Sequence, residues 1–226
     1  MSAAAATTTP VSLVVFDFDG TLIDSQHTVA GAYAAAFTAC GLPAPSLAEV
    51  RQVIGLSLPV AVAELRPNLG TDLIEAVVAA YRQAYFDRSL GPGHVDPLFD
   101  GARCALRALE AAGLLLGIAT GKSQRGLLAA LEAHDLRRHF VTLQTADHHP
   151  SKPHPAMLQQ AIAEAGATPA QTVLVGGTAF DMAMAVNAGA TALGVAWGYH
   201  GADELTAAGA AAVCDSFDDV VAGCGA

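Results

Sequence analysis

An almost wholly apolar run, Val11 to Val15, leads into two aspartates, Asp17 and Asp19. Its β-branched residues predict a strand that is buried on both faces. Side chains two residues apart in an extended chain point the same way, so both carboxylates face one site while Phe18 packs on the other side. Gly20 then permits a sharp turn. Because two close like charges repel unless a cation or a shared proton relieves them, this strand end predicts a chemical role.

The composition predicts one large globular domain or a domain with an insertion. The chain has 226 residues, of which 53% are apolar and only 14% are charged. These values are typical of a well-buried protein and not of a disordered one. The net charge is −10 and no basic cluster occurs, so nucleic acids and anionic membranes are poor candidates as partners.

Three features indicate a cytoplasmic protein. The four cysteines have no metal-type spacing, so we interpret them as reduced thiols. Residues 1–10 are rich in Ala and Thr and lack a basic segment followed by an apolar core. We therefore expect a disordered lead-in there and not a signal peptide. No apolar run approaches the length of a membrane span.

About seventy residues after Leu22 have helical spacing and no strand signal. We expect helices over 29–40, 46–54, 57–65 and 73–85. Residues 24–94 are thus predicted to form an inserted bundle of helices. Its two tethers, residues 22–25 and 91–98, would serve as hinges.

From Leu98 onward, strand and helix signals alternate. Strands are expected over 114–120, 140–145, 172–175, 190–196 and 211–214, with helices between them. This alternation predicts an α/β fold with a doubly wound parallel sheet. Residues 11–23 and 95–226 would form this Rossmann-like core, with 24–94 as an α-helical cap.

The ends of the strands are the expected ligand site of an open α/β sheet. Thr120, Gly121 and Lys122 follow one strand and lead into a helix, whose free N–H groups and dipole attract anions. Thr120 or Ser123 could equally cap that helix, and the two interpretations are compatible. A P-loop is excluded because Leu116 stands where its first glycine is required.

Two further strand ends carry candidate residues. Lys152 lies in a segment stiffened by prolines and could neutralise phosphate and carboxylate charge. Five histidines crowd the region from His134 to His154, but their spacing matches no standard zinc site, so we interpret them as solvated loop residues. The next strand ends Gly176-Gly177-Thr178, with Asp181 three residues on.

These motifs, in this order, resemble the phosphoglycolate-phosphatase-like branch of the haloacid dehalogenase-like hydrolase superfamily. The resemblance runs from about Val11 to Val221 and includes DxDGT, Thr-Gly-Lys and Lys-Pro-x-Pro. It implies that Asp17 is the nucleophile, that Asp19 is the general acid and base, and that Lys152 balances charge. The implied phosphate-binding residues are Gly20, Thr21, Thr120, Gly121 and Lys122. Mg²⁺ would be held by Asp17, Asp19 and Asp181.

The chain departs from the family pattern at Gly177, where the pattern Gly-Asp-x-x-x-Asp has its metal-binding aspartate. Mg²⁺ often needs only one or two protein carboxylates, so binding could survive in weakened form, with water or Asp181 in that place. Alternatively, the chain is an inactive relative or an engineered variant. The first alternative predicts that Gly177→Asp raises Mg²⁺ affinity and turnover.

By the same resemblance, Arg51 is expected to lie in the cap segment that faces the active site. It could meet a substrate carboxylate or a second phosphate, or form a surface salt bridge. Taken together, the sequence predicts a Mg²⁺-dependent phosphatase of a small phosphorylated metabolite that acts through an aspartyl-phosphate. The alternative is a silent homologue that binds phosphate or a protein partner. A receiver-type signalling domain is disfavoured by the helical insertion and by Asp19.

Overall fold

The structure, a computed structural model, describes residues 10–89 and 95–226. Most of the expected lead-in, residues 1–10, therefore lies outside the described residues. Within them, one six-stranded parallel sheet has the order β3-β2-β1-β4-β5-β6. The strands are β1 (Leu13–Phe16), β2 (Leu115–Thr120), β3 (Thr142–Thr145), β4 (Thr172–Gly176), β5 (Thr191–Val195) and β6 (Ala212–Cys214). The fully buried strand β1 lies in the interior of the sheet.

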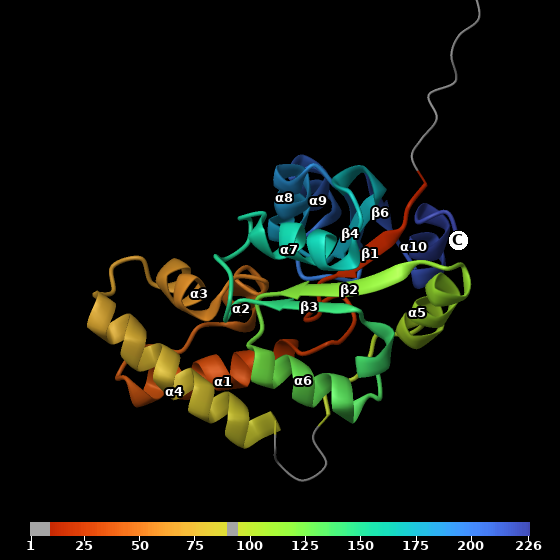
Figure 1. Cartoon of the computed structure of the whole chain (residues 1–226). Coiled ribbons are helices and arrows are strands. Elements are labelled where there is room, and N and C mark those ends of the chain that lie inside the picture. Colours follow the sequence, from red (N-terminus) through yellow and green to blue (C-terminus); the bar gives the residue numbers. More distant parts are fainter. Residues whose placement is uncertain (1–9, 90–94) are drawn as a thin grey trace, which may run out of the picture.

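Helices cover both faces of this sheet (Figure 1). One hydrophobic core lies against α5 (Ala102–Ala111), α6 (Gln124–Ala133) and α10 (Phe217–Gly223). A second core lies against α7 (Ala156–Ala165), α8 (Ala179–Ala188) and α9 (Ala202–Ala207). Short 3-10 turns, Arg137–His139 and Pro169–Gln171, precede β3 and β4. The predicted doubly wound parallel sheet is confirmed, because a strand run buried on both faces needs helices on both sides.

The remaining four helices form the segment inserted between β1 and α5. They are α1 (Gln26–Ala39), α2 (Leu47–Arg51), α3 (Leu58–Leu65) and α4 (Thr71–Ser89). Figure 1 shows them gathered on one side of the sheet, away from α10. They enclose a third core that includes Phe37, Val62 and Val77. A capping box opens α2, where Ser46 Oγ accepts a hydrogen bond from Glu49 N.

The two tethers of the insertion lie side by side where they are described. Ile23 forms an antiparallel bridge with Leu98. Asp24 N donates to Pro97 O at 2.9 Å, and Phe99 N donates to Leu22 O at 3.0 Å. Residues 91–94 of the second predicted hinge lie outside the described residues. The chain thus leaves the sheet and returns to it at one place.

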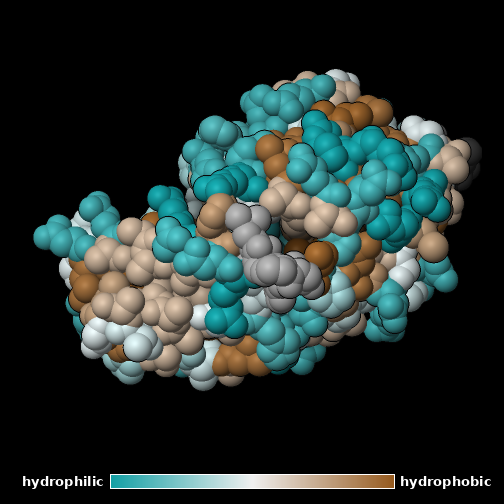
Figure 2. Space-filling view, turned by 90° about the horizontal axis from the view of Figure 1, so that it is seen from below, coloured by the Kyte–Doolittle hydropathy of each residue, from teal (hydrophilic) through white to brown (hydrophobic). Residues whose placement is uncertain are grey.

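The helices, the surface and the cysteines have the following properties. In the described ranges, no helix combines the length and the apolar character that crossing a membrane requires. Figure 2 shows hydrophilic and hydrophobic residues interspersed on the face seen there. All four cysteines are free thiols.

Candidate active site

The turn after β1 presents the two aspartates. Asp17 N donates to Val175 O at 2.9 Å, so Asp17 continues the alignment of β1 with β4. Phe18 is fully buried in the core on the α5 side, as predicted. Gly20 has a φ of +78° and its N–H donates to Ile23 O at 2.8 Å. A left-handed backbone favours glycine, and a Cβ there would also stand 2.6 Å from the Tyr199 ring.

Asp17 belongs to a fully buried cluster of two carboxylates and one ammonium group. Lys152 Nζ lies 2.9 Å from Asp17 Oδ1 and 2.6 Å from Asp181 Oδ1. Asp181 Oδ2 accepts hydrogen bonds from Thr178 N at 3.1 Å and from Thr178 Oγ1 at 2.7 Å. Asp17 Oδ2 is buried and has no hydrogen-bond partner within the described residues. Asp17 Oδ1 likewise has no hydrogen-bond partner there, but it lies 2.9 Å from Lys152 Nζ, so Oδ2 is the carboxylate oxygen of the cluster that neither Lys152 nor Thr178 engages.

The charges in this cluster do not balance, and the pKa values reflect this. Burial, and then the neighbouring Asp181 carboxylate, raise the pKa of Asp17 to about 7, although Lys152 acts in the opposite direction. Burial lowers the pKa of Lys152, but Asp17 and Asp181 more than offset this effect, so the pKa is raised. The cluster therefore holds an ammonium group between two acids that compete for it.

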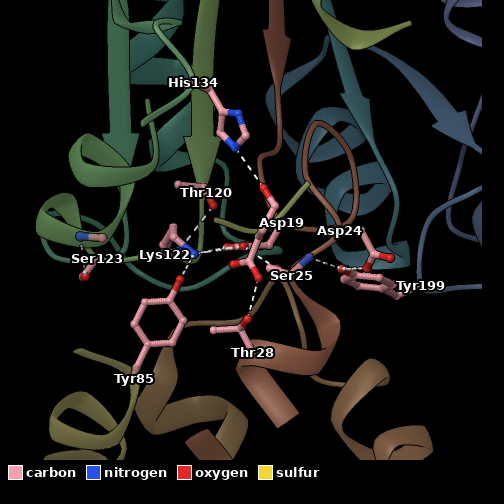
Figure 3. Close-up of polar contacts among 12 residues, drawn as sticks. Asp19, Asp24, Ser25, Thr28, Tyr85, Thr120, Lys122, Ser123, His134 and Tyr199 are labelled. Atoms are coloured by element: carbon pink, nitrogen blue, oxygen red, sulfur yellow. Dashed lines mark hydrogen bonds and ion pairs between the residues drawn. The ribbon is translucent and has the colours of Figure 1, made fainter. Parts of the chain in front are cut away.

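Asp19 belongs to a second cluster, which is shown in Figure 3. Lys122 Nζ lies 2.9 Å from Asp19 Oδ1 and 3.1 Å from Oδ2, and it donates to Tyr85 Oη at 2.7 Å. Ser25 Oγ donates to Asp19 Oδ1 at 2.6 Å. Burial lowers the pKa of Lys122, but Asp19 and Tyr85 outweigh it and raise the pKa. A cation held in this way stays charged.

The two aspartates thus face different lysines. A cavity of about 700 Å³ between the inserted helices and the sheet is lined by Asp19 and Lys122 but not by Asp17. Asp17 is only 1% exposed. A smaller cavity of about 500 Å³ reaches Lys152 past Val53 and Leu56. Asp19 therefore faces an open cavity, whereas Asp17 does not.

The polar groups that follow β2 form hydrogen bonds with other groups of the protein. Ser123 caps α6 by accepting from Gly126 N at 3.3 Å, and Thr120 Oγ1 accepts from Lys122 N at 3.3 Å. Asp147 Oδ2 accepts from Gln124 N at 2.8 Å. A Cβ on Gly121 would stand 2.5 Å from the Gly55 carbonyl of the insertion. The residues predicted to bind phosphate thus lie directly beneath the inserted segment.

Thr21 and Arg51 have different surroundings. Thr21 Oγ1 is fully buried without a hydrogen-bond partner in the described chain, while Thr21 O accepts from Trp197 Nε1 at 3.1 Å. Arg51 is exposed, and its Nε donates to Gln26 Oε1 at 2.7 Å. Arg51 lines neither cavity. The structure therefore brings Thr21 to the site and leaves Arg51 on the surface of the insertion.

Gly177 is a place where two backbone segments touch. Tyr199 N and His200 N both donate to Gly177 O at 3.1 Å. A Cβ on Gly177 would stand 2.5 Å from Gly20 O and 2.9 Å from Gly198 Cα. An aspartate at this position has no room unless the backbone moves, and the expectation that Gly177→Asp raises Mg²⁺ affinity and turnover stays a prediction.

The predicted Mg²⁺ ligands do not fit a ready-formed metal site. No group of three or more His, Cys, Asp or Glu side chains that could hold a metal ion occurs in residues 10–89 and 95–226. Asp19 is engaged by Lys122 and Ser25, and both oxygens of Asp181 are engaged by Lys152 and Thr178. The ammonium groups stand where a cation would be expected.

Sequence reasoning did not identify Tyr85, Ser25 and Tyr199. Tyr199 Oη accepts from Ser25 N at 3.1 Å, and the Tyr199 ring packs beneath Gly20. Tyr199 lies shortly after the end of β5. The rule that ligand sites gather at strand ends therefore also points to Tyr199. Tyr85 carries no such signal, because a tyrosine on a helix face is ordinarily a core residue.

Comparisons with known proteins give the class. A family model described as haloacid dehalogenase-like hydrolase matches residues 14–195, so the chain belongs to this family. A probable phosphatase, IndB, of Dickeya dadantii (strain 3937) is 37% identical over 213 residues, which cover 92% of this chain and 91% of that protein. A phosphoglycolate phosphatase of Salmonella paratyphi A (strain ATCC 9150 / SARB42) is 30% identical over 227 residues, with coverages of 92% and 90%.

Solved structures have the same fold. A protein described as a predicted phosphoglycolate phosphatase from Haemophilus somnus 129pt has a TM-score of 0.84 at 24% identity, and a predicted phosphatase from Clostridium acetobutylicum has 0.86 at 21%. Each match covers 95% of this chain and 98% of the other. The resemblance to the phosphoglycolate-phosphatase-like branch, which the motifs predicted, is confirmed.

Proposed function

We propose that this protein is a phosphatase that hydrolyses a small phosphorylated metabolite in the cytoplasm. The observation that carries the proposal is the buried, unengaged Oδ2 of Asp17 beside Lys152. A desolvated carboxylate with a free lone pair is a nucleophile, and a fixed ammonium group stabilises the charge of a transferring phosphoryl group. The relatives named as phosphatases support the same activity.

In the first step, Asp17 Oδ2 forms a bond to phosphorus as the bond from phosphorus to the leaving oxygen breaks. Asp19, which must hold a proton at this point in place of its ion pair with Lys122, gives that proton to the leaving oxygen, and the group leaves as an alcohol. In the second step, Asp19 takes a proton from water, the water oxygen bonds to phosphorus, and the Asp17 carboxylate is released. Lys152 and Lys122 supply positive charge in both steps. Because Asp17 is buried, the inserted helices must move as a cap before substrate binds.

Phosphatases of this superfamily generally depend on a metal ion, and the resemblance implies Mg²⁺. The carboxylates of this chain do not fit that ion as they stand, because they are paired with Lys122 and Lys152. A silent homologue is the second candidate, because Gly177 lacks the carboxylate of the family pattern.

The test is a phosphate-release screen over phosphomonoesters, with and without Mg²⁺, for the wild type and for Asp17→Asn. We expect turnover by the wild type and a loss of at least about a thousand-fold in the variant. Trapping the phosphoenzyme by acid quench and mass spectrometry should place the phosphoryl group on Asp17. Release that is equal in the two proteins would reject the nucleophile. No release from any ester, with or without Mg²⁺, would favour the silent homologue.

A further inference from the structure

The 700 Å³ cavity beside Asp19 is large for the substrate of a phosphoglycolate phosphatase. One water molecule occupies about 30 Å³ in the liquid, so the cavity has room for on the order of twenty non-hydrogen atoms. Because Asp19 would protonate the leaving oxygen, the leaving group must lie in this cavity. A two-carbon acid would leave most of it filled with water.

The walls of the cavity are largely apolar and aromatic. Val53, Ile54 and Leu56 line one part, and all three are buried in the core of the insertion. Tyr33 and Tyr81 line another, with their ring centroids 4.5 Å apart. Walls of this kind bind flat or apolar groups by excluding water and by ring stacking.

Three cations and two carboxylates, Asp19 and Asp147, line the cavity, and none of the cations is both buried and unpaired. Lys122 is its buried cation, and it is already paired with Asp19 and Tyr85. Arg82 and Arg125 also line the cavity, but both are exposed, and Arg125 lies 3.7 Å above the centre of the Phe86 ring. A carboxylate on the leaving group would have to give up its hydration without a buried partner.

We propose that the substrate is a phosphomonoester of a bulky, uncharged alcohol with a largely apolar or aromatic body. This inference rests on the proposed function and narrows it to one class of leaving group. Discrimination would come from the walls formed by the inserted helices, while the phosphoryl chemistry at Asp17 stays the same. Phosphoglycolate and other esters with a second anion would be poor substrates.

The first test compares esters whose leaving alcohols are chemically alike, so that reactivity does not confound size. Ethyl phosphate, 2-phenylethyl phosphate and 2-(2-naphthyl)ethyl phosphate form such a series, and 2-phosphoglycolate is the anionic comparator. We expect kcat/KM to rise at least about ten-fold from the ethyl to the naphthylethyl ester, chiefly through KM. A preference for phosphoglycolate, or no dependence on the aromatic group, would overturn the proposal.

The second test changes the cavity wall. Leu58 is half-buried and lines the cavity, whereas Val141, the residue before β3, is exposed and lines neither cavity. Leu58→Arg should lower kcat/KM for the naphthylethyl ester about ten-fold and raise it for phosphoglycolate. Val141→Arg, which makes the same kind of change outside the cavity, should leave the preference unaltered. Equal effects of the two substitutions would contradict the assignment.

A third measurement separates this inference from the proposed function. Calorimetry of 2-(2-naphthyl)ethylphosphonate and of 3-phosphonopropionate with the wild type reports binding without turnover. Tighter binding of the naphthyl compound by about ten-fold or more, lost in Leu58→Arg, supports the cavity even if no ester is hydrolysed. Equal binding of the two compounds, or tighter binding of the carboxylate compound, rejects it even if phosphatase activity is found.

Discussion

Lys152 is the residue on which the buried cluster depends. Its ammonium group is shared between Asp17 and Asp181, and all three side chains are almost fully buried. Burial raises the pKa of Asp17, and the Asp181 carboxylate raises it further, because one positive charge cannot neutralise two carboxylates. Such strain at a reactive group is a common cost of function. The residue that carries the chemistry is thus expected to weaken the fold at neutral pH.

Asp17→Asn should remove this strain and abolish activity. A carboxyl whose pKa is higher in the folded state contributes stability below its unfolded pKa of about 3.9, and this contribution is lost as the pH rises through the folded value of about 7. The Tm of the wild type should therefore fall, relative to that of the variant, from pH 4 to pH 8. Thermal unfolding in EDTA-containing buffers measures this difference. A Tm difference that is constant over this range would contradict the raised pKa.

Gly177 can be tested without reference to activity. A Cβ at this position meets the Gly20 carbonyl and Gly198 Cα, both of which are backbone atoms. We expect Gly177→Ala to cost about 1–3 kcal/mol of unfolding free energy, as overpacking usually does. Gly177→Asp should be at least as destabilising.

Gly70→Ala is the matched control for that substitution, because nothing lies within 4 Å of a Cβ there. Gly70 O accepts from Ile74 N at the start of α4, where glycine is a better cap than alanine, so the cost should stay below about 1 kcal/mol. Urea unfolding with a common m-value compares the variants. Equal stability of Gly177→Ala and Gly70→Ala would show that the backbone segments can separate freely.

At the scale of elements, the inserted helices are fastened to the sheet across the site. Ser57 N donates to Ser151 Oγ at 2.8 Å, and Tyr85 of α4 meets Lys122 at the end of β2. Asp17 itself is buried. If Asp17 is the nucleophile, as we propose, we expect these contacts to break when substrate reaches it.

A reversible cross-link between these elements should stop turnover. In a variant carrying Ser57→Cys and Ser151→Cys, a short bifunctional methanethiosulfonate reagent would hold the insertion against the sheet. We expect loss of phosphate release after cross-linking and recovery when dithiothreitol cleaves the link. Each single variant, treated in the same way, controls for reaction at the exposed native Cys104. Full activity of the cross-linked protein would show that substrate reaches Asp17 without this movement.

The elements were largely predictable from sequence, and their side-chain partners were not. Apolar strands such as Leu13–Phe16 and capped helices such as α2 have local signals, so their order and type followed from the pattern. The ion pair between Lys122 and Asp19 joins residues 103 positions apart. A sequence motif places each of them at a strand end, but it does not say which acid each lysine will meet.

Gly177 is a second case in which the surroundings of a residue could not be predicted from the sequence. Its departure from the family pattern is visible in the sequence, whereas the close approach of Gly198 depends on how the segment after β5 crosses the end of β4. Long-range packing of this kind overrides local pattern. For Arg51 the sequence left both a substrate contact and a surface ion pair open, and its exposed side chain donates to Gln26 Oε1.

At the scale of the whole molecule, the net charge repels a phosphate ester, whereas the local charge at the strand ends attracts it. The chain carries a net charge of −10, which repels a phosphate ester at long range. Two buried lysines, Lys122 and Lys152, provide local positive charge at the strand ends. Attraction therefore acts at short range, so selection among esters falls to the shape and polarity of the cavity.

The paired tethers have a consequence for how such a molecule can evolve. The chain leaves the sheet at Asp24 and returns at Pro97, and a hydrogen bond of 2.9 Å joins these two residues. The whole inserted segment is therefore connected to the sheet at a single position. A recombination event that exchanged the inserted segment would change the residues that line the cavity in one step. The strand order and Asp17 would be inherited unchanged.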